Sequence, residues 1–451
     1  VRRPQGGRGA AGQWSHFGTT MSSTVPSVGS GRPWVESGRQ LAGSEGRDHD
    51  VPPHTKRRKG EDRRGEGRKR GQRHVSTKGA LDAGGGGGVG GSRRTRAAGG
   101  GVGGQFRPYA RKRAVLRGLD KIFQMSWSED NFSLFGCDIM QCFYDVANMA
   151  GEPVRARALM YAEQLAQRWK HTLMHVGWMQ GDTPTPQEVI DAMVSMYCLE
   201  RVGIHHDIKS EVTASVGMYT AMEYHGWDPL EGPPPAKVVD VYTGEMIGRH
   251  RSMSNSLVNA FYADRVGISL GCSYEQILRW LPTLRPYKGP KDLRWEEYID
   301  QCYLVTHVVF TLNNWGELRL EPELFPHEFF FIREQLPVQM KQGDVHLVGE
   351  FAEALRCFGA PDSDMLMQAV IAFLLEAQEE DGSWDRGEDR DDYTTYHATM
   401  VGIQALLAHN YRGVGPGITE LAPLLEKWYL EELARKPTPW PSKGGGEGAS
   451  Q

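Results

Sequence analysis

The stretch Phe373-Leu374-Leu375-Glu376-Ala377-Gln378-Glu379-Glu380-Asp381-Gly382-Ser383-Trp384 joins an apolar helix pattern to a Gln, a Gly and a Trp. Apolar residues up to this point recur at helical spacing, which predicts a helix over about residues 363–378. Asp381-Gly382 predicts a turn, because Gly adopts backbone conformations that residues with a Cβ resist. A second apolar pattern covers about residues 394–409. The stretch therefore predicts a helical hairpin.

Similar helical patterns recur before this hairpin, with few alternations typical of strands. The sequence therefore predicts an all-α fold. Residues 227–250, which include Gly232-Pro233-Pro234-Pro235, interrupt the series and are expected to form a loop insertion or a crossover between two halves. The predicted helices span residues 138–149, 154–174, 186–202, 206–224, 254–266, 274–281, 295–312, 326–342, 344–358, 363–378, 394–409 and 418–432.

Composition divides the chain into unlike parts. Residues 1–113 are rich in Gly and Arg and hold 24 Lys and Arg against 8 Asp and Glu, whereas 114–451 holds 28 against 48. The first segment has too few apolar residues to form a core, so we predict a disordered basic tail. The domain is predicted over 114–436, and 437–451 is predicted as a second disordered tail. The basic run Lys56-Arg57-Arg58-Lys59 is compatible with nucleic-acid binding by the tail, or with a dispensable leader.

The cellular compartment is predicted from two features. The chain has no apolar run of about 20 residues, so no transmembrane helix is predicted. Its six Cys are irregularly spaced, without the paired spacing of a zinc ribbon, which favours a reducing environment. We therefore expect an intracellular protein, cytoplasmic or in an organelle lumen, that is not secreted.

Phe373, Leu374, Gln378, Gly382 and Trp384 resemble, in register, the Q-W turn of the α/α-toroid superfamily. That superfamily includes the terpene cyclases, such as squalene and oxidosqualene cyclases, and the protein prenyltransferases. The basic residue that usually opens the motif is missing here. The resemblance implies that 114–436 forms an α/α toroid, a barrel of helical hairpins whose inner helices surround a central cavity.

The resemblance also implies where catalytic residues would lie, because polar groups near the start of inner helices act on the substrate in these toroids. His307, His346 and His397 each follow a polar residue closely on a predicted helix, and Asp344 begins one of these helices. Glu350, nearly two turns after Asp344, is expected to be an acid or base partner of His346, or part of a polar seam. At least two of the three histidines are expected to line one pocket on the order of 300–1,000 Å³.

The squalene-hopene cyclases carry an Asp-x-Asp-Asp-Thr-Ala motif whose middle Asp protonates the substrate. Asp389-Arg390-Asp391-Asp392 resembles it, but aligning the helices that follow places His397 at the catalytic position and the acids in the preceding loop. Imidazolium is a much weaker acid toward an alkene than an activated carboxylic acid. Acid–base chemistry on an activated group is therefore expected instead.

Three classes of function remain open from the sequence. The first is an enzyme, similar to a cyclase, isomerase or transferase, that acts on a hydrophobic small molecule, such as an isoprenoid, in the central cavity. The second is a toroid module that binds a lipid or peptide without catalysis, and the third is an α/α-barrel hydrolase or lyase for sugars. Protein prenyltransferases hold zinc through Asp, Cys and His, and the residues here that would supply such ligands are Asp344, His346, His307, His397 and Cys302.

Overall fold

The described part of the chain is mostly helical, as predicted. A computed structural model describes residues 103–173, 183–241, 243–384 and 391–434. These described residues all belong to one compact unit, and the second unit, 24–100, lies outside the described residues. The predicted tail 437–451 and residues 1–102 of the predicted N-terminal tail also lie outside them, so their disorder stays a prediction.

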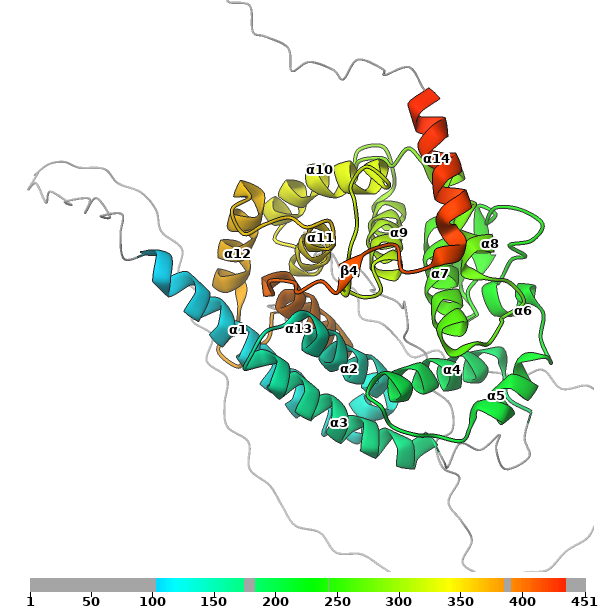
Figure 1. Cartoon of the computed structure of the whole chain (residues 1–451), viewed down its shortest axis with the longest axis horizontal. Helices are drawn as coiled ribbons and strands as arrows, with labels where there is room; N and C mark the ends of the chain where they lie inside the picture. The colour runs from blue at the N-terminus through cyan, green and yellow to red at the C-terminus, as the bar shows by residue number, and fades with distance from the viewer. Residues whose placement is uncertain (1–102, 174–182, 242, 385–390, 435–451) are drawn as a thin grey trace, which may run out of the picture. The chain divides into compact units, whose positions relative to one another are not determined.

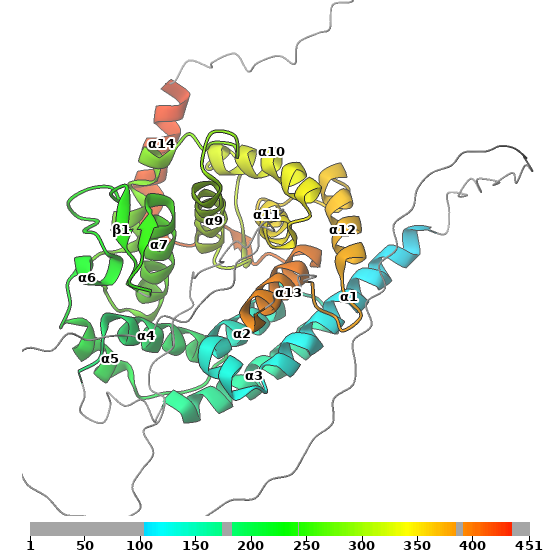
Figure 2. The same cartoon turned by 180° about the vertical axis from the view of Figure 1, so that it is seen from behind.

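Six helices contact one another in chain order, and the last returns to contact the first (Figure 1). Each of the six is separated from the next along the chain by a segment that packs on the outside of this cycle (Figure 2). The six helices, called the inner helices below, are α2 (Glu129–Met149), α4 (Pro186–Arg201), α7 (Arg249–Val266), α9 (Trp295–Leu312), α11 (Val345–Cys357) and α13 (Asp392–Leu406).

The remaining helices support the inner ones from outside. Helix α1 contacts α13, α3 contacts α2, α8 contacts α7, and α10 contacts α11. The outer helices and short turns are α1 (Gly103–Met125), α3 (Val154–Leu173), α5 (Lys209–Val216), α6 (Ala221–His225), α8 (Tyr274–Leu278), α10 (Pro326–Gln342), α12 (Met365–Ala377), α14 (Ala422–Ala434) and the 3₁₀ turns Leu281–Leu284 and Thr419–Leu421.

Strands are few and short within the described residues. In the region 227–250, β1 (Lys237–Val239) and β2 (Met246–Gly248) form an antiparallel pair that leads into α7. A parallel pair, β3 (Leu318–Arg319) with β4 (Gly413–Val414), joins the segment after α9 to the segment after α13.

Local sequence signals explain where the helices that carry the site begin. The Asp344 side chain accepts a hydrogen bond from the Leu347 amide, 3.0 Å away, and so caps α11. Asp391 caps α13 through the Thr394 amide in the same way, at 2.6 Å. These caps satisfy amide groups that have no partner within the helix, and they fix the first turn of both helices.

The Q-W stretch ties α12 to α1 and α13. The Gln378 side chain donates to the carbonyl groups of Ala114 and Gly382, at 2.9 and 3.0 Å. The buried Trp384 indole donates to the Leu374 carbonyl at 2.7 Å and packs against Gly118 and Gly402. This turn therefore fixes the position of α13 relative to the outer helices.

The structure differs from the predicted elements at several places, and α2 and α7 begin at Glu129 and Arg249, before their predicted starts at 138 and 254. Helix α1 begins at Gly103, so the predicted boundary between residues 113 and 114 falls inside it. Its buried face, which includes Val115 and Ile122, was obscured in the sequence by the Arg residues between its apolar positions. The single helix predicted over 206–224 is instead α5 and α6, because Thr220 and Glu223 form a capping box that starts a new helix.

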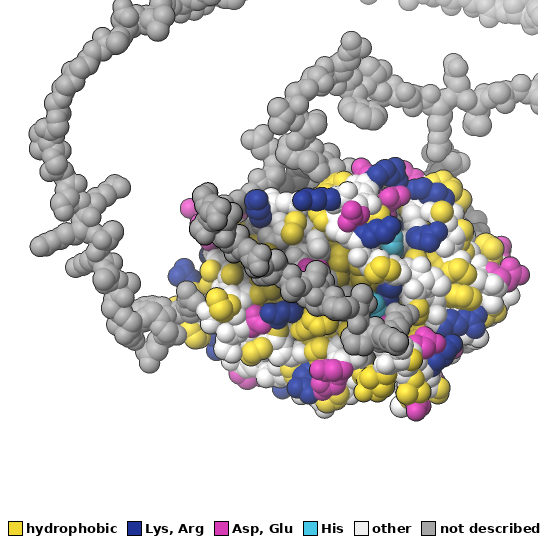
Figure 3. Space-filling model, turned by 90° about the horizontal axis from the view of Figure 1, so that it is seen from above, with side chains coloured by type: hydrophobic (Ala, Val, Ile, Leu, Met, Phe, Trp, Pro, Cys, Tyr) yellow, Lys and Arg dark blue, Asp and Glu magenta, His cyan; other side chains and the backbone are white. Residues whose placement is uncertain are grey.

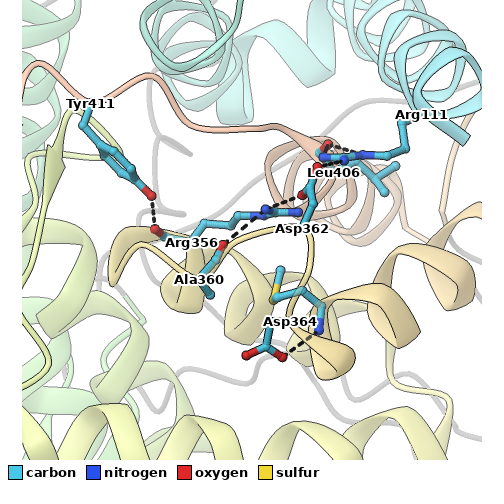
Figure 4. Close-up of polar contacts among 8 residues, drawn as sticks. Arg111, Arg356, Ala360, Asp362, Asp364, Leu406 and Tyr411 are labelled. Atoms are coloured by element: carbon cyan, nitrogen blue, oxygen red, sulfur yellow. Dashed lines mark hydrogen bonds and ion pairs between the residues drawn. The ribbon is translucent and has the colours of Figure 1, made fainter. Parts of the chain in front are cut away.

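A polar cluster joins α1 to the far ends of α11 and α13 (Figure 4). Arg111 donates to the Leu406 carbonyl at 3.0 Å and forms an ion pair with Asp362. Asp362 also accepts from Arg356 at 2.6 Å, and the Tyr411 hydroxyl donates to the Arg356 carbonyl. The cluster holds these helix ends together on the side away from the α11 and α13 caps.

No helix within the described ranges is long and apolar enough to cross a membrane. On the face that Figure 3 shows, Lys and Arg side chains alternate with Asp and Glu and form no large patch of one sign.

Candidate functional site

A cavity of about 90 Å³ lies between five of the six inner helices. Its volume is smaller than the several hundred Å³ expected from the sequence. It is lined by Asp138, Gln141, Cys142 and Asp145 of α2, Arg251, Ser254, Asn255, Val258 and Tyr262 of α7, Tyr303, His307 and Phe310 of α9, Trp315 after α9, Glu350 and Glu353 of α11, and Tyr393, His397, Met400, Val401 and Gln404 of α13.

The lining residues form one stripe along each helix. On α2 they recur at positions 138, 141, 142 and 145, the spacing of a single helical face. The rest of α2 is largely apolar and buried, as Ile139, Phe143 and Val146 show. A polar stripe on an otherwise apolar helix indicates that this face meets other polar groups inside the protein.

Glu350 is the hydrogen-bonding centre of the cavity. The Thr306 hydroxyl donates to its Oε2 at 2.5 Å, and Nε2 of His397 lies 3.4 Å from its Oε1. Burial acts to raise the pKa of Glu350, but the bond from His397, the nearby His307 and the Thr306 hydroxyl outweigh it, and the pKa is lowered. Glu350 is therefore ionised at neutral pH, although it is only 2% exposed.

His346 and His397 extend this arrangement from the cavity to the start of α11. Their Nδ1 atoms are 3.2 Å apart and their rings are nearly parallel, at 13°. Burial and the neighbouring His397 lower the pKa of His346 to about 3, so His346 is neutral. Because Glu350 accepts from Nε2 of His397, the Nδ1 pair shares one hydrogen when both rings are neutral.

The other predicted site residues lie around these groups. His307 lines the cavity, and its Nδ1–H donates to the Tyr303 carbonyl at 2.7 Å. Burial lowers the pKa of His307, so the ring is neutral and Nε2 carries the lone pair. Asp344 does not line the cavity but caps α11, two residues before His346. The structure thus brings His307, His397 and Glu350 to one cavity, with His346 behind His397.

Three further carboxyl groups line the cavity and were not predicted. Burial raises the pKa of Asp138 well above its usual value. Burial together with Glu350 and Asp145 does the same for Glu353. For Asp145, burial and Glu317 raise the pKa, and Arg201 and Gln141 oppose them without reversing the shift. The cavity therefore combines one ionised carboxylate with three carboxyl groups that resist ionisation.

Aromatic rings cover the wall between α7 and α9. Trp315 lies parallel to Tyr262 at 2°, with ring centroids 6.1 Å apart, and 5.8 Å from Phe310. Asn314 and Trp315 both have positive φ, at 57° and 52°, which is strained for a Trp. This strained turn places the indole in the cavity wall.

The predicted zinc ligands do not form a metal site within the described residues, where no three His, Cys, Asp or Glu side chains converge suitably for a metal ion. Cys302 is buried in α9 and is not among the cavity-lining residues. Of the predicted loop acids, Asp391 is the cap of α13, Asp392 is the first residue of that helix, and Asp389 lies outside the described residues.

A family described as a domain of unknown function (DUF6895) matches residues 234–407. The match covers α7, α9, α11 and α13, and so includes most of the cavity wall, but it leaves out α2. No curated protein and no solved structure matches the chain.

The unpredicted cavity residues left a signal in the sequence. Asp138, Gln141, Cys142 and Asp145 follow the i, i+3, i+4, i+7 pattern of one helical face, and Glu353 lies one turn after Glu350. Buried acids at helical spacing would have identified both walls. An acidic stripe on a helix usually faces solvent, so the sequence alone does not place this stripe of α2 inside the protein. Only the contacts between the helices show that it faces the cavity.

Proposed function

We propose that this cavity is the active site of an enzyme that acts on a small molecule by general acid–base catalysis. In this proposal Glu350, with His397 hydrogen-bonded to it, is the general base, and Glu353 is the general acid. The supporting observation is that these two carboxyl groups lie one helical turn apart, line the same cavity and have pKa values shifted in opposite directions.

The environments of the two groups explain how the roles divide. Glu350 accepts from Thr306 and pairs with His397, interactions that stabilise a carboxylate. Glu353 is buried beside Glu350 and Asp145, whose negative charges favour its protonated form. One group is therefore ready to accept a proton at the pH at which the other still holds one, as general acid–base catalysis requires.

The neutral His346 adds a route for the proton. The proton that Glu350 takes from a substrate can pass to Nε2 of His397 when that ring carries its hydrogen on Nδ1. The Nδ1 hydrogen then moves to Nδ1 of His346, and His346 releases its Nε2 hydrogen at the start of α11. Two nearly parallel imidazole rings whose Nδ1 atoms are 3.2 Å apart can hold one added proton but not two, because two imidazolium rings would repel each other. The pair would therefore work as a single proton acceptor.

The toroid architecture is part of the same proposal. It is supported by the succession of the six inner helices, with α13 in contact with α2, and by the position of the Q-W stretch between α12 and α13. An intracellular location also stays a prediction, supported by six cysteines that are all free and buried. A hydrophobic or isoprenoid substrate stays a prediction as well, although the many carboxyl groups of the cavity favour a polar one.

Chemical labelling tests the assignment without knowledge of the substrate. A small diazo compound esterifies protonated carboxylic acids, whereas a small epoxide such as glycidol is opened by ionised carboxylates. At neutral pH we expect the diazo ester on Glu353 and the epoxide ester on Glu350, both mapped by peptide mass spectrometry. The assignment fails if both reagents modify the two residues equally.

Turnover is tested in a mixture of small metabolites incubated with the purified full chain. We expect wild-type protein to consume at least one compound, and Glu350→Gln and Glu353→Gln variants to leave it unchanged. Glu426→Gln, on the exposed side of α14, is the matched control for loss of one carboxylate and should retain turnover. Consumption by the Glu350→Gln variant at the wild-type rate would contradict the proposal.

A further inference from the structure

Among the described residues around the cavity, acidic side chains outnumber basic ones. Four carboxyl groups line it, and Arg251 is the one Lys or Arg among the lining residues. Nε of Arg251 already lies 3.0 Å from Asp300, so this guanidinium is largely neutralised. Arg201, whose charge acts on Asp145, is paired with Glu317 at 2.6 Å. The described residues that line the cavity thus carry more carboxyl groups than cations, and a bound cation would favour the ionised forms of Asp138 and Asp145, whose pKa values burial raises.

Asp145 gives independent evidence that a partner is missing from this wall. Its side chain is 2% exposed, and within the described residues its Oδ1 atom has no hydrogen-bond partner. A buried carboxylate oxygen normally accepts hydrogen bonds, because burying it unpaired is costly. Since Asp145 lines the cavity, a hydrogen-bond donor bound in the cavity would supply a partner for its Oδ1 atom.

The aromatic wall suits a positively charged group. Trp315 and Tyr262 belong to the cavity lining, together with Tyr393 and Phe310. Ring faces attract cations, most strongly for Trp. The strained backbone of Asn314 and Trp315 holds the indole at this place, and such strain persists where a site requires it.

We propose that the cavity binds a small organic cation, a primary or quaternary ammonium group, between the carboxyl groups of Asp138 and Asp145 and the rings of Trp315 and Tyr262. This inference rests on the proposed function, because it names the substrate class of the same site. The ammonium N–H groups, or its polarised methyl groups, would meet Oδ1 of Asp145. Glu350 and His397, on the α11 and α13 side, would then face the rest of the molecule.

An organic cation fits better than a metal ion. No group of three suitable ligands converges for a metal within the described part of the chain. A metal ion also needs several oxygen or nitrogen ligands at short, fixed distances, whereas an ammonium group is held by charge and ring faces at looser distances. The cavity, at about 90 Å³, has room for an amine of a few heavy atoms.

Titration calorimetry on the full chain at neutral pH tests this inference. The probes are ethylammonium and tetramethylammonium chloride, with ethanol, sodium acetate and magnesium chloride as neutral, anionic and metal comparisons at constant ionic strength. We expect the two ammonium ions to bind and the other probes not to bind. Asp138→Asn and Asp145→Asn should each weaken ammonium binding by about tenfold or more, since each removes a carboxyl group that the bound cation would hold in its ionised form. Glu426→Gln should leave it unchanged.

Competition in the wild-type chain provides a readout that does not depend on the folding of a variant. Ethylammonium should slow esterification of Glu353 by the diazo compound. The inference is overturned if no ammonium ion binds, if binding is equal in wild type and in both variants, or if magnesium binds in its place. The two proposals fail separately: opposite labelling of Glu350 and Glu353 without ammonium binding retains the acid–base enzyme, whereas ammonium binding with equal labelling retains only a cation-binding cavity.

Discussion

Glu350 and Glu353 are separated by one turn of α11 and line one cavity, yet their protonation is driven in opposite directions. The difference arises from their neighbours rather than from burial, since both side chains are 2% exposed. Thr306 and His397 face Glu350, whereas Glu350 itself and Asp145 face Glu353. Replacing each of the two residues by Gln should therefore change the stability of the protein in opposite directions.

Glu353→Gln should stabilise the protein at neutral pH. The folded pKa of Glu353 is raised above its unfolded value, so folding above the unfolded pKa of about 4.3 requires the side chain to take up a proton, which opposes folding. Glutamine keeps the shape and removes this effect. We expect a gain of about 1 kcal/mol or more at pH 7 that disappears near pH 4, measured by urea denaturation.

Glu350→Gln is the matched contrast, because its pKa is lowered and its stabilising contribution is present above the unfolded pKa and lost in acid. It should destabilise the protein at pH 7 by about 1–3 kcal/mol, since Thr306 and His397 lose a charged acceptor. Changes of the same sign in the two variants would show that the two environments do not differ as described.

His346 should make the protein less stable in mild acid. Its folded pKa of about 3 lies far below the unfolded value of about 6.5, so the folded state resists protonation. Stability is complete above about pH 6.5 and falls as the pH decreases toward about 3. His346→Asn should therefore lose less stability than wild type between pH 7 and pH 5 in a denaturant titration.

Nuclear magnetic resonance provides the direct check for this residue. The resonance of His346, assigned by its absence from the His346→Asn spectrum, should show no titration between pH 7.5 and pH 5. A midpoint near 6.5 would mean that the ring is solvated and that its contact with His397 does not persist in solution.

The helices could be predicted from sequence where apolar runs have clear ends. The predicted ranges 295–312 and 326–342 agree with α9 and α10, because Pro326 starts α10 and Gly343 ends it with a φ of 79°. Helix α1 was not predicted, since its apolar residues are interspersed with Arg in a segment dominated by Gly and Arg. Composition outweighed periodicity in that segment.

The candidate site was predicted only in part. His307 and His397 were predicted because each follows a polar residue closely on a helix that the toroid resemblance places inside, and Glu350 because it lies nearly two turns after Asp344. Asp138, Asp145 and Arg251 were not, because their helices carry more polar residues and the sequence does not show which face is inside. The pairing of Nδ1 atoms in His346 and His397 depends on how α11 and α13 pack, which no local pattern reveals.

Trp384→Ala should destabilise the domain strongly. The indole is fully buried, packs against Gly118 and Gly402, and donates a hydrogen bond to the Leu374 carbonyl. Removing a buried Trp typically costs roughly 3–5 kcal/mol. Asp391→Asn is the control, because Asn caps a helix about as well as Asp, and it should cost a few tenths of a kcal/mol. Similar small losses in both variants would exclude a structural role for the Q-W turn.

Gly382→Ala should be the more damaging of two glycine substitutions at positive φ. Gly382 has a φ of 96°, and a Cβ there would lie 2.6 Å from the Arg117 carbonyl oxygen of α1. Gly203 has a φ of 75°, but no atom lies within 4 Å of the position of its Cβ. Gly203→Ala therefore measures the backbone strain alone, about 1 kcal/mol, and Gly382→Ala adds the clash with α1.

We expect the loss of stability at Gly382 to exceed that at Gly203 by about 1–3 kcal/mol in urea denaturation. Equal losses would mean that the turn before Trp384 can move away from α1, and that the Gln378 bond to Ala114 does not hold it there.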